Sequence, residues 1–298
     1  MTGHLIHIGY PKTGSNFLRR WFRGHPRLAY ADGGIAGFHN VYDIVKAGAG
    51  LPSGALYRVT SAEGLATPQP TFGDRISEYE RPRPVRMDEA QAAVCRMLAG
   101  LFPTASVLIV TRGFRAAVLS MYSEFARNGG NLEFAPFCAH LETVMPSRED
   151  GWDYCYLIGL YTAAFGASNV IVMPYELLRD DPDAFTNTLA DRLGVEHFAA
   201  PRERVNTSLS PEELYWYPRI TRIVKKAAPR RLFHSYALAA FKNRLRIPIR
   251  VLQRLRPGAP VTAAAVPERL AEAFRGRADC LRDHPLYQAY APDYLFQL

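Results

Sequence analysis

The stretch HIGYPKTGSNFLRRWF, residues 7–22, constrains the fold most strongly. The run HLIHIG, residues 4–9, is short and apolar and ends at a glycine, as a buried parallel strand does. After Gly14, bulky apolar side chains recur at helical spacing, so residues 15–23 are expected to form a helix. A strand, a glycine turn and a helix in this order begin a doubly wound sheet, in which ligands bind at the carboxyl ends of the strands.

The rest of the chain continues this alternation of strands and helices. We expect further strands at 55–61, 106–111 and 169–174, and helices at 88–101 and 152–165. This pattern predicts an α/β fold of P-loop-like, three-layer α/β/α type with a central, mainly parallel sheet.

The later part of the chain differs in character from the first part. Residues 64–86, rich in proline, glycine and charge, are expected to form a long surface loop. Beyond about residue 210 the pattern is mostly helical. We therefore expect an α/β core over 1–215 and a basic, mainly helical C-terminal extension over 216–298 that packs on it.

Composition narrows the class of protein. No apolar run approaches the roughly 18–20 residues of a membrane span, and the N-terminus makes a poor signal peptide. We therefore expect a cytoplasmic protein. Its four cysteines are far apart without CxxC spacing, so reduced thiols are expected. The eight histidines show no metal-ligand spacing, and no metal site is expected.

The glycine turn itself indicates a phosphate site. Gly9 and Gly14 have the G-x-x-x-x-G spacing of a Walker A loop, which continues with Lys and then Ser or Thr. Here Ser15 and Asn16 follow instead, and the only lysine, Lys12, lies inside the loop. Inward-pointing N–H groups and the positive end of the helix favour an anion. The pattern predicts a phosphate cradle without magnesium, although an ordinary strand–turn–helix has the same glycines.

Two motifs resemble those of a known family. YPKTGSNFL (10–18) resembles the 5′-phosphosulfate-binding loop of sulfotransferases that use 3′-phosphoadenosine 5′-phosphosulfate (PAPS). VTRGFRAAVLSMY (110–122) supplies Arg112 and Ser120 at the spacing of that family's second signature. Weaker likenesses occur in NVIVMPYELLRDDP (169–182) and VNTSLSPEEL (205–214), so the resemblance covers about residues 4–215.

The resemblance implies a role for each matching residue. Lys12 would contact the bridging oxygen of the leaving phosphosulfate, and Arg112 and Ser120 would bind the 3′-phosphate. The implied nucleotide-binding residues are Pro11, Lys12, Thr13, Gly14, Ser15, Asn16, Phe17, Arg112 and Ser120. Gly14, Ser15 and Asn16 would hold the 5′-phosphate, and Phe17 would lie near the adenine. The chain departs from the pattern at Asn16 and after Arg112, and the family's late lysine-containing glycine motif has no match.

The implied reaction is in-line transfer of a sulfuryl group from PAPS to an acceptor hydroxyl on a carbohydrate, lipid or other molecule. The sulfuryl group carries less charge than a phosphoryl group, so a lysine and N–H groups can stabilise the leaving oxygens without a metal. The family's base follows the strand after the first helix, which indicates Glu63 as the catalytic base. Glu63 also fits a helix-capping pattern, and His39 is the alternative base.

The positive charge of the chain is concentrated in one segment. Residues 219–256 hold twelve Lys or Arg and no Asp or Glu, and the remainder has 24 basic and 28 acidic residues. Leu, Ile, Val and Phe are interspersed. This composition fits two kinds of partner: the anionic inner surface of a membrane and an acidic glycan. It also fits a solvated basic face over a helical core, without any partner. No nucleic-acid motif accompanies it, so nucleic acid is not an expected partner.

Two other functions fit parts of the sequence. A P-loop kinase of a small metabolite would bind MgATP, but the missing Lys-Ser/Thr pair disfavours it. A non-catalytic nucleotide-binding protein at a membrane surface would bind the nucleotide without turnover, and Lys12 and Glu63 disfavour it.

Overall fold

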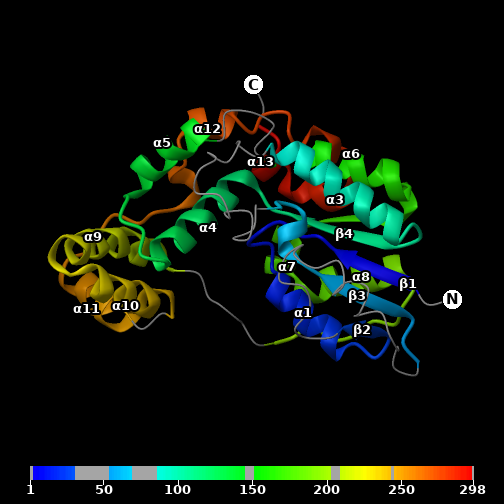
Figure 1. Ribbon diagram of the computed structural model, residues 1–298, viewed down its shortest axis with the longest axis horizontal. Coiled ribbons are helices and arrows are strands. Elements are labelled where there is room, and N and C mark those ends of the chain that lie inside the picture. The colour runs from blue at the N-terminus through cyan, green and yellow to red at the C-terminus, as the bar shows by residue number, and fades with distance from the viewer. Residues whose placement is uncertain are drawn as a thin grey trace, which may run out of the picture. The chain divides into compact units, whose positions relative to one another are not determined.

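The computed structural model describes residues 3–30, 54–68, 86–144, 151–202, 209–242 and 245–296. They belong to two compact units (Figure 1). The first unit comprises 1–113, 147–205 and 274–298, and the second comprises 114–146 and 206–273. The sequence predicts two consecutive domains with a boundary at residue 215. The two units are interleaved along the chain and do not test this boundary, which stays a prediction.

A five-stranded sheet forms the centre of the first unit. Its strands are β1 (Gly3–His7), β2 (Leu28–Tyr30), β3 (Tyr57–Ser61), β4 (Ser106–Thr111) and β5 (Val170–Pro174). Their order is β2-β3-β1-β4-β5, and every pairing is parallel. The predicted parallel sheet is confirmed. Only β2, which is three residues long, was missed from the sequence.

Helices cover both faces of this sheet (Figure 1). They are α1 (Ser15–Gly24), α3 (Met87–Leu101), α6 (Tyr154–Phe165), α7 (Tyr175–Asp180) and α8 (Pro182–Leu193). α1 and α8 bury their apolar faces against alternate strand residues such as Leu108 and Val110, whereas α6 contacts β4 and β5 and also packs on α3. The predicted three-layer α/β/α arrangement is confirmed.

α1 shows why this segment becomes a helix on a buried face. Its Leu18, Trp21 and Phe22 are fully buried, while Arg19 and Arg20 between them are half-buried. The indole Nε1 of Trp21 donates to the carbonyl of Phe198 at 3.0 Å, so its single polar atom is satisfied. This packing fixes the start of α1 just after β1.

The second unit is helical in its described residues. Its helices are α4 (Phe114–Arg127), α5 (Phe134–Val144), α9 (Pro211–Ala227), α10 (Arg230–Phe241), α11 (Arg246–Leu255) and α12 (Glu268–Glu272), with a short η5 (Ala263–Ala265). α9 begins with a capping box between Ser210 and Glu213, which satisfies two backbone donors at its start. No helix of the described segments is long and apolar enough to cross a membrane.

The cysteines differ from the sequence expectation. Cys155 in α6 and Cys280 in η6 (Asp279–Leu281) form a disulfide, with their Cα atoms 5.5 Å apart. The start of α6 lies beside the C-terminal segment, since the N–H of Cys155 donates to the carbonyl of Arg277 at 3.0 Å. A separation of 125 residues left no local signal of this pairing. The expectation of reduced thiols was therefore wrong for this pair, while Cys95 and Cys138 are free and buried.

Reduction of this disulfide should destabilise the protein. The bond closes a loop of 125 residues, for which chain entropy predicts a stabilisation of up to about 5 kcal/mol. Urea unfolding with and without reductant measures the change in the free energy of unfolding. The double variant Cys155→Ser/Cys280→Ser should unfold at the same urea concentration in both conditions. Cys95→Ala is the control and should keep it. Alkylation of four thiols in the unfolded, unreduced protein would contradict the pairing.

Candidate functional site

The turn between β1 and α1 has an unusual backbone. Lys12 has a φ of 67° and Gly14 a φ of 85°, both in the left-handed region. Such a conformation costs a residue with a side chain about 1–2 kcal/mol. Thr13 is buried between them, and its Oγ1 donates to the carbonyl of Tyr10 at 2.6 Å. The Thr13 hydroxyl therefore holds the turn closed, and the turn keeps Lys12 in a strained conformation.

Both glycines of this turn are required by close packing. A Cβ on Gly9 would lie 2.5 Å from Nε2 of His7, and a Cβ on Gly14 would lie 2.4 Å from the side chain of Leu178. At either position a side chain would force its neighbour to shift, and Gly14 also has a positive φ. The G-x-x-x-x-G spacing recognised in the sequence therefore reflects a steric constraint.

The start of α1 has hydrogen-bond donors that could bind an anion. No side chain caps this helix, and its first turn contains no acidic residue. Ser15 is 2% exposed, and its Oγ has no hydrogen-bond partner among the described residues. A buried hydroxyl left unpaired costs about 1–3 kcal/mol. The positive helix end and the Ser15 hydroxyl together suit a ligand with anionic oxygens.

Arg112 brings the second sequence motif to this turn. It follows β4, the strand next to β1, and its Nη1 donates to the carbonyl of Lys12 at 2.7 Å. Its guanidinium also lies over the ring of Tyr175, 4.5 Å from the centroid. Nε of Arg112 is buried and makes no hydrogen bond with any described residue. The two motifs predicted from residues 10–18 and 110–122 therefore meet, with a donor of Arg112 unused.

The main chain around Arg112 is held by two buried side chains. The hydroxyl of Tyr154 donates to the carbonyl of Arg112 at 2.6 Å. Burial raises the pKa of Tyr154, so this hydroxyl stays protonated. Glu176 is 1% exposed, and its Oε1 accepts from the N–H of Gly113 at 3.0 Å. These contacts fix the direction in which Arg112 leaves the strand.

Tyr154, Tyr175 and Glu176 were not assigned to the site from the sequence. Tyr154 lies in the helix expected at 152–165, and its full burial is typical of a residue that packs in a core. Tyr175 follows β5 directly, and a position at the carboxyl end of a parallel strand is the one sequence signal that indicates it.

The predicted base lies beyond the neighbouring strand. β3 pairs with β1 in parallel, with Ser61 opposite His7, and Glu63 opens η1 (Glu63–Leu65) two residues after β3 ends. Oγ of Ser61 lies 2.8 Å from Nδ1 of His7. Burial, with a smaller contribution from Arg19, lowers the pKa of His7 to about 3, so its imidazole is neutral. Glu63 as base stays a prediction, and His39 lies outside the described residues.

The other predicted contacts are divided between the units. Pro11, in the turn, is half-buried, Asn16 in the first turn of α1 is exposed, and Phe17 is partly buried and packs against the hydrophobic core. Ser120 lies buried in α4 of the second unit, whereas Arg112 belongs to the first. A phosphate shared by Arg112 and Ser120 therefore stays a prediction. Among the described residues, no group of three His, Cys, Asp or Glu could hold a metal ion.

Solved structures that are similar to this chain include two sulfotransferases. No family model and no curated protein matches the chain. A sulfotransferase from Alicyclobacillus acidocaldarius is similar with 15% identity and a TM-score of 0.49, over 83% of this chain and 96% of that one. The mouse sulfotransferase SULT7A1, in complex with PAP, is similar with 14% identity and a TM-score of 0.44, over 98% and 87%.

The left-handed backbone at Lys12 leads to a stability prediction. Lys12→Gly should be more stable than Lys12→Ala by about 1 kcal/mol, because only glycine adopts a positive φ without a steric cost. Urea unfolding of both variants measures the difference. The matched pair Arg20→Gly and Arg20→Ala, inside α1, should show the opposite order. Equal stability of the two Lys12 variants would contradict the strained turn.

Proposed function

We propose that this chain is a sulfotransferase that moves a sulfuryl group from PAPS to an acceptor hydroxyl. The observation that carries the proposal is the hydrogen bond from Arg112 to the carbonyl of Lys12. It joins the two segments whose sequences resemble the phosphosulfate loop and the 3′-phosphate signature of that family. Neither motif alone would distinguish this donor from other nucleotides, and their meeting at adjacent strand ends favours one nucleotide site.

The residues of the turn fit the 5′ side of this donor. The uncapped N-terminus of α1 offers backbone N–H groups, and the unpaired Oγ of Ser15 offers a further donor. Lys12 supplies a full positive charge at the same turn. An anionic phosphosulfate would satisfy these donors together, because charge-assisted hydrogen bonds are about twice as strong as neutral ones. Asn16 then binds through its N–H and its amide rather than as a magnesium ligand.

Arg112 fits the 3′-phosphate that distinguishes PAPS from ATP. Its Nη1 is used by the carbonyl of Lys12, while Nε has no partner among the described residues. The ring of Tyr175 supports the flat side of the guanidinium. An arginine held in this way loses little side-chain entropy when it binds a phosphate. Ser120 of α4 would add a hydroxyl to the same phosphate.

The transfer itself requires charge stabilisation and a base. Lys12 would stabilise the negative charge that develops on the bridging oxygen as the sulfuryl group leaves. Glu63, at the end of the strand beside β1, would remove the proton of the acceptor hydroxyl. The acceptor hydroxyl gains the sulfuryl group, and 3′-phosphoadenosine 5′-phosphate (PAP) leaves. The strand order supports this assignment, because Glu63 and Lys12 follow two neighbouring strands, β3 and β1.

Calorimetry with PAP tests the donor site. PAP should bind equally well with and without Mg²⁺, and more tightly than ATP. Arg112→Ala should weaken PAP binding by about 10- to 100-fold, as expected for charge-assisted hydrogen bonds to a phosphate. Arg27→Ala is the control, since Arg27 pairs with Glu196 at the surface, and should bind PAP like the native protein. A preference for ATP with Mg²⁺ would overturn the proposal in favour of a kinase.

Turnover with labelled PAPS and a panel of sugars, lipids and phenols tests the base. Glu63→Gln should lower kcat by about 10²–10⁴-fold, the usual contribution of a general base, and leave PAP affinity unchanged. His39→Gln is the comparison and should retain turnover. The reverse result would assign the base to His39. PAP binding without turnover on any acceptor would instead favour the non-catalytic nucleotide-binding protein.

A further inference from the structure

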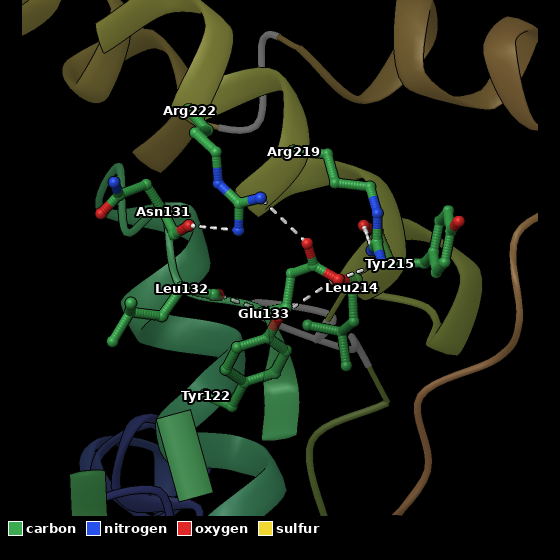
Figure 2. Close-up of polar contacts among 8 residues, drawn as sticks. All are labelled: Tyr122, Asn131, Leu132, Glu133, Leu214, Tyr215, Arg219 and Arg222. Atoms are coloured by element: carbon green, nitrogen blue, oxygen red, sulfur yellow. Dashed lines mark hydrogen bonds and ion pairs between the residues drawn. The ribbon is translucent and has the colours of Figure 1, made fainter. Parts of the chain in front are cut away.

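Some arginines of the basic segment 219–256 are held inside the second unit. Figure 2 shows Glu133, at the start of α5, between Arg219 and Arg222 of α9. The guanidinium of Arg219 also lies over the ring of Tyr215, 3.5 Å from its centroid, and Arg222 donates to the carbonyl of Asn131 at 3.3 Å. These two arginines therefore have a structural role in joining α9 to the α4–α5 connection.

A second glutamate, Glu213, forms ion pairs with two more arginines of the segment. Glu213 is 1% exposed, and its carboxylate lies 2.8 Å from Nε of Arg246 and 3.5 Å from Nε of Arg250. A buried carboxylate needs such partners, because an unpaired one would be strongly destabilising. These pairs fasten the first half of α11 to the start of α9.

The other described basic residues of the segment are exposed. Those that form no ion pair with any described residue are Lys225, Lys226, Arg230, Arg231, Lys242, Arg254 and Arg256. The segment thus has four arginines that pair with Glu133 or Glu213 and an outer set that pairs with neither. The outer set produces a positive surface on the second unit.

An apolar stripe runs along α11 within this positive surface. Ile247, Val251 and Leu255 are 74%, 52% and 74% exposed. They are spaced four residues apart and therefore lie on one face of the helix, while Ile249 on the opposite face is 1% exposed. Isolated exposed apolar residues are common, but an aligned set of three beside arginines marks an interaction surface.

We propose that this face of α11 docks on an anionic phospholipid surface. We define the α11 face as Ile247, Val251, Leu255 and Arg254, together with Arg256, which directly follows the last residue of the helix. Its three apolar side chains would enter the boundary between headgroups and acyl chains, and its two arginines would remain at the level of the phosphates. The outer lysines and arginines of α9 and α10 would add longer-range attraction to the anionic surface. This inference concerns partner binding and is independent of the proposed sulfuryl transfer.

The composition of the face favours lipid over two other occupants. A second copy of this chain would bring the same positive charges against Arg254 and Arg256, and like charges disfavour association. An acidic glycan would pair with the arginines but leave Ile247, Val251 and Leu255 in water. Only a surface with both negative headgroups and an apolar interior matches the charges and the apolar stripe together.

Flotation with phospholipid vesicles tests the inference. The full chain should bind phosphatidylcholine vesicles that contain about one third phosphatidylserine, and bind pure phosphatidylcholine weakly. High salt should reduce the binding. The triple variant Ile247→Ser/Val251→Ser/Leu255→Ser should bind at least about tenfold more weakly. The double variant Arg254→Gln/Arg256→Gln should bind about 25-fold more weakly, because each arginine contributes a factor of about five.

Controls separate this face from general effects of charge and hydrophobicity. Leu56→Ser/Leu101→Ser and Arg202→Gln change exposed side chains of the first unit and should bind like the native chain. All changed side chains on α11 are exposed, so thermal melting should be unaltered. Equal binding to neutral and anionic vesicles, or native binding by the triple variant, would overturn the inference. A native dimer that the triple variant converts to a monomer would assign the face to a second copy instead.

Discussion

The hydrogen bond between Arg112 and the carbonyl of Lys12 is the interaction on which the site depends. Lys12 has a left-handed backbone, and a residue with a side chain keeps this conformation only when neighbouring groups stabilise it. Arg112, which follows the neighbouring strand β4, does so by donating to the carbonyl of Lys12. Arg112 can do this because its own carbonyl is bound by Tyr154, and the next N–H by Glu176. The conformation of the glycine turn is therefore determined partly by residues a hundred or more positions later in the chain.

The C-terminal segment takes part in this support. Tyr294 donates to Oε2 of Glu176 at 2.6 Å, and the hydroxyls of Tyr287 and Thr111 lie 2.6 Å apart at the end of β4. Burial raises the pKa of both tyrosines well above its ordinary value, so both hydroxyls remain donors. Cys280 ties the same segment to α6. The last residues of the first unit therefore stabilise the strand end that positions Arg112.

Local patterns in the sequence were enough to predict the elements that are locally determined. The apolar runs gave four of the five strands, and the spacing of Leu18, Trp21 and Phe22 gave α1. The disulfide was not predictable, because nothing near either cysteine records a partner 125 residues away. The parts of the candidate site that could be predicted are the glycine turn and Arg112, because glycines at fixed spacing and a charged residue directly after a strand are visible in the sequence. Tyr154 and Tyr175 were not assigned to the site from the sequence, because an aromatic residue in a helix usually indicates packing. Composition also gave no sign of which arginines pair with Glu133 and which form no ion pair.

The strand order explains why so few residues outside the glycine turn were needed to predict a site. β3, β1, β4 and β5 are consecutive in the sheet and parallel, so all four end at the same edge. Their next segments carry Glu63, the glycine turn, Arg112 and Tyr175 in that spatial order. Each of these residues is thus within a few positions of a strand end. Placing the strands from the sequence therefore also places the edge of the sheet at which the candidate site lies, while the orientation of Arg112 depends on Tyr154 and Glu176.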